Sequence, residues 1–464
     1  MQHLAGKSLK RNFWNFIWPS IIAQWIFALY TMVDGLFVAW GVSEVALSAV
    51  NIASPLVNFL FSVSILFAVG ASTVVAIFMG QDHHAAANKV YTQNLVVLMV
   101  ISILITVLVL WRVDDVAIFL GATEETIGYV KEYILNVMPF AWCFMIAYSF
   151  EILVKTDGYP LFATLAVTSG ALMNLVLDYV FVMLLHKGVG GAAFATGLSQ
   201  LALVGIYLTH FLSKKANIKL ARFHFDWRMM LRTIKIGLPS GLTEFSAGIT
   251  VFLFNHFILR YIGAEGIISY TIIAYVNTIV VMSLVGIAQG SQPLISFYYG
   301  RGEAAICQKL LRYGFVAALV LAGIVFGASW LLADWITGLF ISSQMEMLRV
   351  TAARVFRIFS ISFLLMGFNI VVGGYFTAIE RPKSALAISL GRGVITVIIA
   401  LEVMTFLFGG AGIWWAPLIS EFLCLMVTCA LFFVYRKQRK EKKPVVETES
   451  LNEHYLKSEQ KSET

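Results

Sequence analysis

Long apolar segments separated by short polar stretches dominate the pattern along this chain of 464 residues. Each is at least as long as the roughly 18 to 20 residues with which an α-helix crosses a bilayer, whereas strands of a membrane barrel would alternate apolar and polar positions over about ten residues. We therefore expect an all-α polytopic membrane protein with twelve transmembrane helices. The segments run over approximately residues 13–40, 47–79, 93–111, 134–154, 160–185, 190–213, 234–259, 267–299, 311–333, 352–378, 384–408 and 412–435.

The composition excludes a soluble globular protein. Hydrophobic residues make up 59% of the chain and charged residues only 13%, whereas soluble domains carry about 25% charged residues. The first apolar segment is longer than the core of a signal peptide and lacks a cleavage pattern, so we expect it to remain as a helix. The cysteines show no metal-binding spacing, and no HExxH or GxSxG motif occurs. We therefore expect neither an enzyme nor a cofactor.

The basic residues indicate the orientation of the chain. They lie before the first segment, after the sixth, eighth and tenth, and in the tail: Lys7, Lys10, Arg11, Lys214, Lys215, Lys219, Arg222, Arg228, Arg232, Lys235, Arg301, Lys309, Arg312, Arg381, Lys383 and Arg436. Cytoplasmic loops carry an excess of Lys and Arg, so we expect a cell-membrane protein with both termini in the cytoplasm. Topology and contact with anionic membrane lipids then explain the net charge of +7, and no nucleic-acid partner is expected.

The chain contains an internal duplication. Four motifs recur at a spacing of 220 to 222 residues: Trp18-Pro19-Ser20 as Leu238-Pro239-Ser240, Met79-Gly80 as Tyr299-Gly300, Gly158-Tyr159-Pro160 as Glu380-Arg381-Pro382, and Gly190 as Gly412. Each copy has six helices, so both enter the membrane in the same direction, which predicts two six-helix bundles related by a pseudo-two-fold axis along the membrane normal. We expect an N-lobe (1–213), a basic cytoplasmic linker (214–233), a C-lobe (234–435) and a disordered charged cytoplasmic tail (436–464).

Two acids, Asp34 and Asp178, lie within apolar segments of the first copy only. The duplication places Phe254 opposite Asp34, or Asn255 if a gap falls earlier, and Ala400 opposite Asp178. A charged acid at bilayer depth costs roughly 2.5 to 3.5 kcal/mol on insertion scales, so such residues face a cavity or a partner. Acids in one copy alone indicate an ion-coupling site in the N-lobe. A purely structural role, with each acid satisfied by neighbouring helices, stays open.

Two further polar residues share the expected depth of these acids. Asn174 is four residues before Asp178, on the same face of the helix, and Thr196 lies near the outer start of the sixth segment. Two carboxylates, a carboxamide and a hydroxyl form an oxygen-rich set that suits Na⁺ or a shared proton, and no other metal is expected. Pro19, fifteen residues before Asp34, removes a backbone hydrogen bond and predicts either a hinge or a fixed kink.

The second copy holds charged residues of its own at apparent membrane depth. These are Arg392, Glu402 and Glu421. They predict either a substrate or coupling site in the C-lobe, or pairing between helices or snorkelling toward the membrane surface.

Several motifs together resemble the multidrug and toxic compound extrusion transporters, in particular the bacterial and archaeal branch with a carboxylate site in the N-lobe. The motifs cover both copies: Tyr30-Thr31-Met32-Val33-Asp34, Gly70-Ala71-Ser72-Thr73, Asn174 with Asp178, Gly190-Gly191-Ala192-Ala193 leading to Thr196, and Gln289-Gly290-Ser291-Gln292-Pro293. The resemblance implies a cation site onto which Asp34, Asn174, Asp178 and Thr196 map, and a first helix that bends near Pro19. Other branches use an acid in the seventh helix, and Glu244 falls about one turn earlier than that pattern.

The expected function is that of a secondary active multidrug efflux antiporter. It would export organic, often cationic and amphipathic, compounds in exchange for H⁺ or Na⁺, and we expect a monomer. Coupling requires that the ion and the substrate favour different conformations. The alternative is a lipid-linked saccharide flippase of the same superfamily, which shares the lobes and the duplication.

Overall fold

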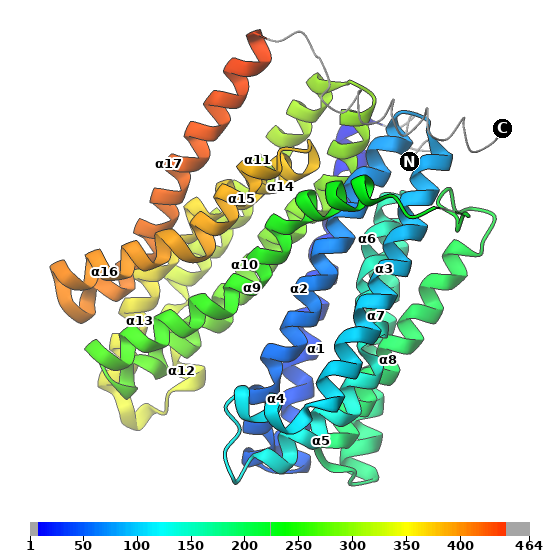
Figure 1. Cartoon of the computed structure of the whole chain (residues 1–464). Coiled ribbons are helices and arrows are strands. Elements are labelled where there is room, and N and C mark those ends of the chain that lie inside the picture. Colours follow the sequence, from blue (N-terminus) through cyan, green and yellow to red (C-terminus); the bar gives the residue numbers. More distant parts are fainter. Residues whose placement is uncertain (1–7, 223, 442–464) are drawn as a thin grey trace.

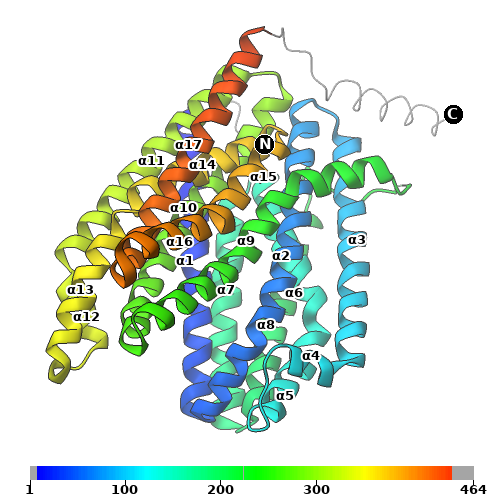
Figure 2. The same ribbon diagram turned by 60° about the vertical axis from the view of Figure 1, so that its left-hand side comes forward.

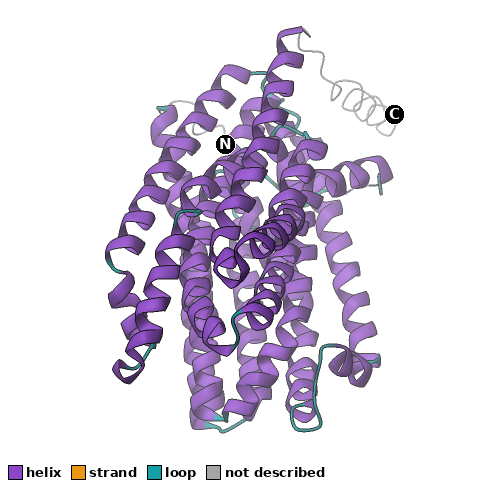
Figure 3. Ribbon diagram, turned by 90° about the vertical axis from the view of Figure 1, so that its left-hand side faces the viewer, coloured by secondary structure: helices purple, strands orange, loops and turns teal. Residues whose placement is uncertain are grey.

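Helices form nearly all of the regular structure. The computed structural model describes residues 8–222 and 224–441, which contain helices and no strand (Figure 3). The α-helices of these residues are α1 (Leu9–Gly41), α2 (Glu44–Gly80), α3 (His84–Trp111), α4 (Val113–Phe119), α5 (Ile127–Val137), α6 (Ala141–Thr156), α7 (Pro160–Asp178), α8 (Gly188–Phe211), α9 (Trp227–Tyr261), α10 (Ala264–Gly300), α11 (Ala304–Leu331), α12 (Ala333–Phe340), α13 (Glu346–Ser360), α14 (Phe363–Ala378), α15 (Pro382–Leu390), α16 (Thr396–Phe408) and α17 (Gly412–Glu441). The prediction of an all-α protein is confirmed.

Eleven helical segments of the described chain are long and apolar enough to cross a membrane. The last of them, Pro382–Arg439, reverses at the 3₁₀-helical turn Gly409–Ala411, where Gly409 adopts a φ of +57° that favours glycine. Because α16 and α17 pack against each other on either side of this turn, the segment is a hairpin of two spans. Counted in this way, residues 8–222 and 224–441 contain the twelve spans that the hydrophobic pattern predicts.

The duplication is visible in the irregularities of the helices. The short helix α4 begins at Val113 and the short helix α12 begins 220 residues later, at Ala333. The fourth span is interrupted in both halves, by the turn Met138–Phe140 between α5 and α6 and by Ile361 and Ser362 between α13 and α14. Interruptions at matching places support two copies of one six-helix unit.

The helices form two groups that lie side by side. Figures 1 and 2 show α1–α8 in one group and α9–α17 in the other. The groups meet where α2 packs against α9 and α10, and where α1 packs against α10. The start of α1 and the end of α17 lie at the same end of the molecule, which we call the terminal end (Figure 1).

Near the terminal end, α2 and α10 cross at very close range. A Cβ atom added to Gly80 would lie 2.2 Å from the carbonyl oxygen of Phe297, and one added to Gly300 would lie 2.3 Å from that of Ile77. Only glycine lets two helix backbones approach so closely. The two contacts are related by the duplication, because both pairs are separated by 220 residues. The lobes are therefore closed against each other at this end.

The predicted linker, 214–233, is only partly a loop. Helix α9 begins at Trp227, so residues 227–233 are helical, because the Asp226 side chain caps the first turn by accepting hydrogen bonds from the amides of Arg228 and Met229. The remaining loop is attached to α3. The Gln93 side chain donates to the carbonyl oxygen of Asp226 over 2.9 Å and accepts from its amide over 3.1 Å.

The first six residues of the predicted tail, 436–441, are helical, because helix α17 continues to Glu441. The rest of the tail, 442–464, lies outside the described residues.

Candidate functional site

Three of the residues predicted for ion coupling meet between α1, α7 and α8. The Thr196 hydroxyl oxygen lies 3.4 Å from Oδ1 of Asp34, and Nδ2 of Asn174 lies 3.4 Å from that hydroxyl oxygen. The single proton of Thr196 has a nearer acceptor in the Ala192 carbonyl oxygen, 3.0 Å away. When that bond forms, a lone pair of the Thr196 oxygen can face a cation beside Asp34.

Asp178, the fourth predicted residue, is the last residue of α7 and is completely buried. The Asp178 carboxyl group lies near the carboxyl group of Asp34 and the side-chain amide of Asn174. Neither of its oxygens, however, is in hydrogen-bonding geometry with a described residue. Two adjacent carboxylates repel each other unless a cation, either a proton or Na⁺, is shared between them. The structure therefore brings all four predicted residues together in an arrangement that can hold one monovalent cation.

An irregular helix follows Asp178. Residues Tyr179–Leu184 form a π-helical turn, and the end of α1 packs on it so closely that a Cβ atom added to Gly41 would lie 2.5 Å from Cγ1 of Val182. In the C-lobe a second π-helical turn, Gly391–Ile395, contains Arg392. Such turns occur often at functional sites. The hydrophobic pattern predicted neither of them, because one inserted residue in a turn leaves no local signal.

Pro19 lies within the continuous helix α1. Its carbonyl oxygen accepts a hydrogen bond of 2.7 Å from the Thr164 hydroxyl of α7. This contact connects the position predicted as a hinge to α7, the helix that carries Asn174 and Asp178. Bending of α1 at Pro19 would require this contact to change.

A small cavity of about 40 Å³ lies next to the ion-coupling residues. Asn174 and Tyr30 line it, together with Ser199, Gln200 and Glu151. Its volume is enough for a few water molecules. We call it the N-lobe cavity.

A larger cavity of about 290 Å³ lies between the lobes, and we call it the central cavity. Helices of both lobes line it, and its apolar wall includes the aromatic residues Phe27, Phe61, Phe254, Tyr270 and Phe359. Binding sites for small organic molecules have this character, with an apolar wall and a few polar groups that fix orientation.

Glu244 of α9 is the charged residue of the central cavity that has no ion pair or hydrogen bond with a described residue. The other two glutamates of the wall are paired: Glu151 with Lys155, and Glu421 with Arg392. The Glu244 carboxylate is thus the group of this wall that is available to a positively charged ligand.

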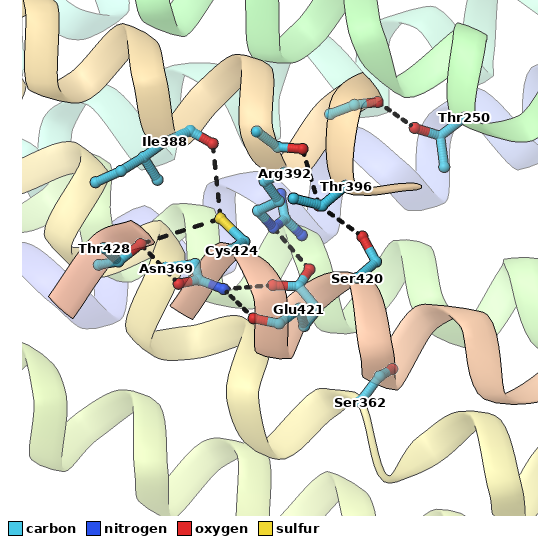
Figure 4. A network of polar contacts seen from close by, with 12 residues as sticks. Thr250, Ser362, Asn369, Ile388, Arg392, Thr396, Ser420, Glu421, Cys424 and Thr428 are labelled. Atoms are coloured by element: carbon cyan, nitrogen blue, oxygen red, sulfur yellow. Dashed lines mark hydrogen bonds and ion pairs between the residues drawn. The ribbon is translucent and has the colours of Figure 1, made fainter. Parts of the chain in front are cut away.

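The C-lobe pair belongs to a network that satisfies both oxygens of Glu421 (Figure 4). Nε of Arg392 donates to Oε1 over 2.9 Å, and Nδ2 of Asn369 donates to Oε2 over 2.7 Å. Thr428 donates in turn to Oδ1 of Asn369 over 2.9 Å. Of the C-lobe residues predicted from the sequence, Glu244, Arg392 and Glu421 line the central cavity, whereas Glu402 is exposed and lines neither cavity.

Sequence reasoning missed Glu151, which lines both cavities. It also missed a polar chain that joins the lobes, in which Gln24 donates to Gln289 over 2.9 Å and Gln289 donates to the Tyr148 hydroxyl over 3.1 Å. An acid in an apolar segment was the available signal for Glu151. The lysine four residues later made it resemble an ordinary ion pair along one helix.

Comparisons with known proteins agree with this architecture. The chain is 24% identical over 441 residues to the multidrug export protein MepA of Staphylococcus haemolyticus, covering 93% of this chain and 95% of that protein. It is also 24% identical to the multidrug export protein MepA of Staphylococcus aureus, over 91% of this chain and 93% of that protein. An outward-facing structure of a multidrug resistance MATE family transporter superposes with a TM-score of 0.89 at 20% identity, covering 95% of this chain and 98% of the other.

The model of the MatE family matches residues 19–180 and 239–402, one stretch in each lobe. Since these stretches make up more than half of the chain, the protein belongs to the MatE family, the multidrug and toxic compound extrusion transporters.

Proposed function

We propose that this protein is a secondary active exporter that releases organic cations through the central cavity in exchange for H⁺ or Na⁺ bound by Asp34, Asn174, Asp178 and Thr196. The observation that carries the proposal is the unpaired Glu244 carboxylate in a cavity that both lobes share. The relatives named for multidrug export support the same reading. One chain supplies the whole cavity, so a monomer in the cell membrane suffices.

The wall of the central cavity suits amphipathic cations. A positive charge is attracted both to the Glu244 carboxylate and to aromatic faces such as those of Phe254 and Tyr270. The apolar remainder of the wall binds the apolar part of a ligand through the hydrophobic effect, which is non-directional and does not select one ligand shape. Such a site accepts many compounds of one chemical class.

Helix α1 connects the two sites. Its residues Gln24 and Phe27 line the central cavity, and Asp34 lies seven residues beyond Phe27 on the same helix. A cation held between Asp34 and Asp178 therefore acts on a helix that forms part of the substrate wall. In this proposal ion and substrate favour different positions of α1 relative to Pro19, which is the differential affinity that coupling requires.

The described conformation corresponds to the outward-facing state if both termini are cytoplasmic. The α2 and α10 crossing then closes the cytoplasmic side, and the central cavity lies between that crossing and the outer side. Substrate release and cation entry would both occur from this state.

The alternative function, a flippase for lipid-linked saccharides, suits the cavity less well. Its ligand carries a diphosphate, which would lie against a wall that holds Glu151, Glu244, Glu421 and a single arginine, Arg392. Arg392 already pairs with Glu421. The charge of the wall favours a cation.

The test is export of ethidium, an aromatic cation, from vesicles that contain the purified protein, with the Na⁺ and pH gradients varied separately. We expect one of the two gradients to drive export. We further expect Asp34→Asn to abolish the driven component, whereas the control Glu402→Gln retains it. Undiminished driven export by the Asp34→Asn variant would refute the proposal.

A further inference from the structure

Five residues line both the N-lobe cavity and the central cavity and so form the wall between them. They are Phe27, Phe61, Tyr148, Glu151 and Val167. Four are uncharged and largely apolar, and the aromatic rings of Phe27 and Phe61 pack edge to face at 5.4 Å. Glu151 is the one carboxylate in this wall. A cation that moves between the cavities must therefore pass a largely apolar partition in which Glu151 is the one charged residue.

A buried lysine holds the Glu151 carboxylate. Nζ of Lys155 lies 2.5 Å from Oε1 of Glu151, and the lysine side chain is 1% exposed whereas the glutamate side chain is 12% exposed. Fully buried lysines are rare and require a partner. The pair is neutral as a whole, and its carboxylate end is the one that reaches the cavities.

The partition is fixed to the opposite lobe. Tyr148, one helical turn before Glu151, accepts a hydrogen bond from Gln289 of α10, and Gln289 accepts one from Gln24 of α1. The other charged or titratable groups of the two cavity walls are Tyr30 in the N-lobe cavity, and Glu244, Tyr270, Arg392 and Glu421 in the central cavity. The position of Glu151 thus depends on the contact between the lobes.

The duplication indicates that the Glu151–Lys155 pair is not a structural requirement of the six-helix unit. At the spacing of 222 residues, Gly373 corresponds to Glu151 and Thr377 corresponds to Lys155. The acid and its lysine therefore occur in the lobe that holds Asp34 and Asp178 and not at the matching places of the other. A link between Glu151 and the ion site accounts for this distribution.

We propose that Glu151 is the entry residue through which the coupling cation passes from the central cavity to the site at Asp34, Asn174 and Asp178. The entering H⁺ or Na⁺ replaces the Lys155 ammonium at the Glu151 carboxylate and then moves on to the N-lobe cavity. The N-lobe cavity, with about 40 Å³ against about 290 Å³, admits the small cation and excludes the organic substrate. This inference rests on the antiport function proposed above.

The experiment compares ethidium export by wild type, Glu151→Gln and the double variant Glu151→Gln/Lys155→Met over a range of driving cation concentrations. For Glu151→Gln, we expect the cation concentration at half-maximal export to rise about tenfold, the effect of one lost ionic contact. The double variant removes the unpaired buried ammonium, so it should fold as well as wild type and still show the raised cation requirement.

Restoration of the wild-type cation requirement in the double variant would overturn the proposal, because it would show that Glu151 only neutralises Lys155. Wild-type behaviour of Glu151→Gln would overturn it as well. Glu151→Asp keeps the charge and the pairing with Lys155 but shortens the reach, so a raised cation requirement is expected there too. Export by Asp34→Asn in the same vesicles reports separately on the antiport function, since its retention contradicts that function whatever Glu151 does.

Discussion

The close crossing of α2 and α10 allows a quantitative prediction for Gly80→Ala. The new methyl group would lie 2.2 Å from the Phe297 carbonyl oxygen, and ordinary contact begins at 3.4 Å, so the two helices must separate locally by about 1.2 Å. Overpacking of this kind costs about 1–3 kcal/mol. Because the contact exists only when the terminal end is closed, that cost shifts the population toward the state open at this end by about 5- to 150-fold.

The assay is the distance between two spin labels, measured by electron paramagnetic resonance. Ala85 and Ala305 are exposed, follow the two crossing helices and lie 220 residues apart, so labelled cysteines at these positions report the separation of the lobes in a background without the exposed Cys429. We expect Gly80→Ala and its counterpart Gly300→Ala to increase the fraction of molecules in which the two spin labels are far apart.

Gly248→Ala is the matched control for this substitution. An added Cβ atom at Gly248 meets nothing within 4 Å, so this variant gains only the helix propensity of alanine, about 1 kcal/mol. If Gly80→Ala gives the same distance distribution as wild type and Gly248→Ala, the conclusion that this crossing closes the terminal end is wrong.

Two further predictions concern buried polar groups. Arg392→Met leaves the Glu421 carboxylate buried without its cation and should destabilise the protein by about 3–5 kcal/mol, measured by thermal unfolding in detergent, and adding Glu421→Gln should recover most of the loss. A destabilisation by Arg392→Met of less than about 1 kcal/mol would contradict a structural role of the Arg392–Glu421 ion pair. Asp157→Asn should weaken the attachment of the linker to the N-lobe, because the buried Asp157 carboxylate accepts hydrogen bonds from the backbone and side-chain amides of Asn217. Hydrogen exchange of the Asn217 amide should accelerate by about tenfold for a bond of roughly 1.4 kcal/mol, and unchanged exchange would show that the carboxylate charge is not needed there.

The hydrophobic pattern predicted the spans and the recurring motifs predicted the duplication, because apolarity and motif spacing can both be read directly from the sequence. The grouping of Asp34, Asn174, Asp178 and Thr196 could be anticipated in part. Helical periodicity puts Asn174 and Asp178 on one face, but only the packing of α1, α7 and α8 brings that face to Asp34 and Thr196. Their role in coupling stays a prediction.

Other features depend on contacts between distant residues. Glu402 and Glu421 look equivalent in the sequence, yet one is exposed and the other is buried against Arg392, because the rotation of each helix decides which face meets the cavity. The double role of Glu151 in two cavity walls likewise follows only from the three-dimensional packing.

The most direct measurement of the central claim is the release of the coupling ion when substrate binds. Ethidium is added to the purified protein in detergent, once with Na⁺ preloaded and once in weak buffer, and released Na⁺ or protons are counted. The account predicts that wild type releases one of the two ions in a fixed ratio to bound ethidium, and that Asp34→Asn releases none while still binding ethidium. Ethidium binding to wild type without release of either ion, or equal release by Asp34→Asn, would contradict it.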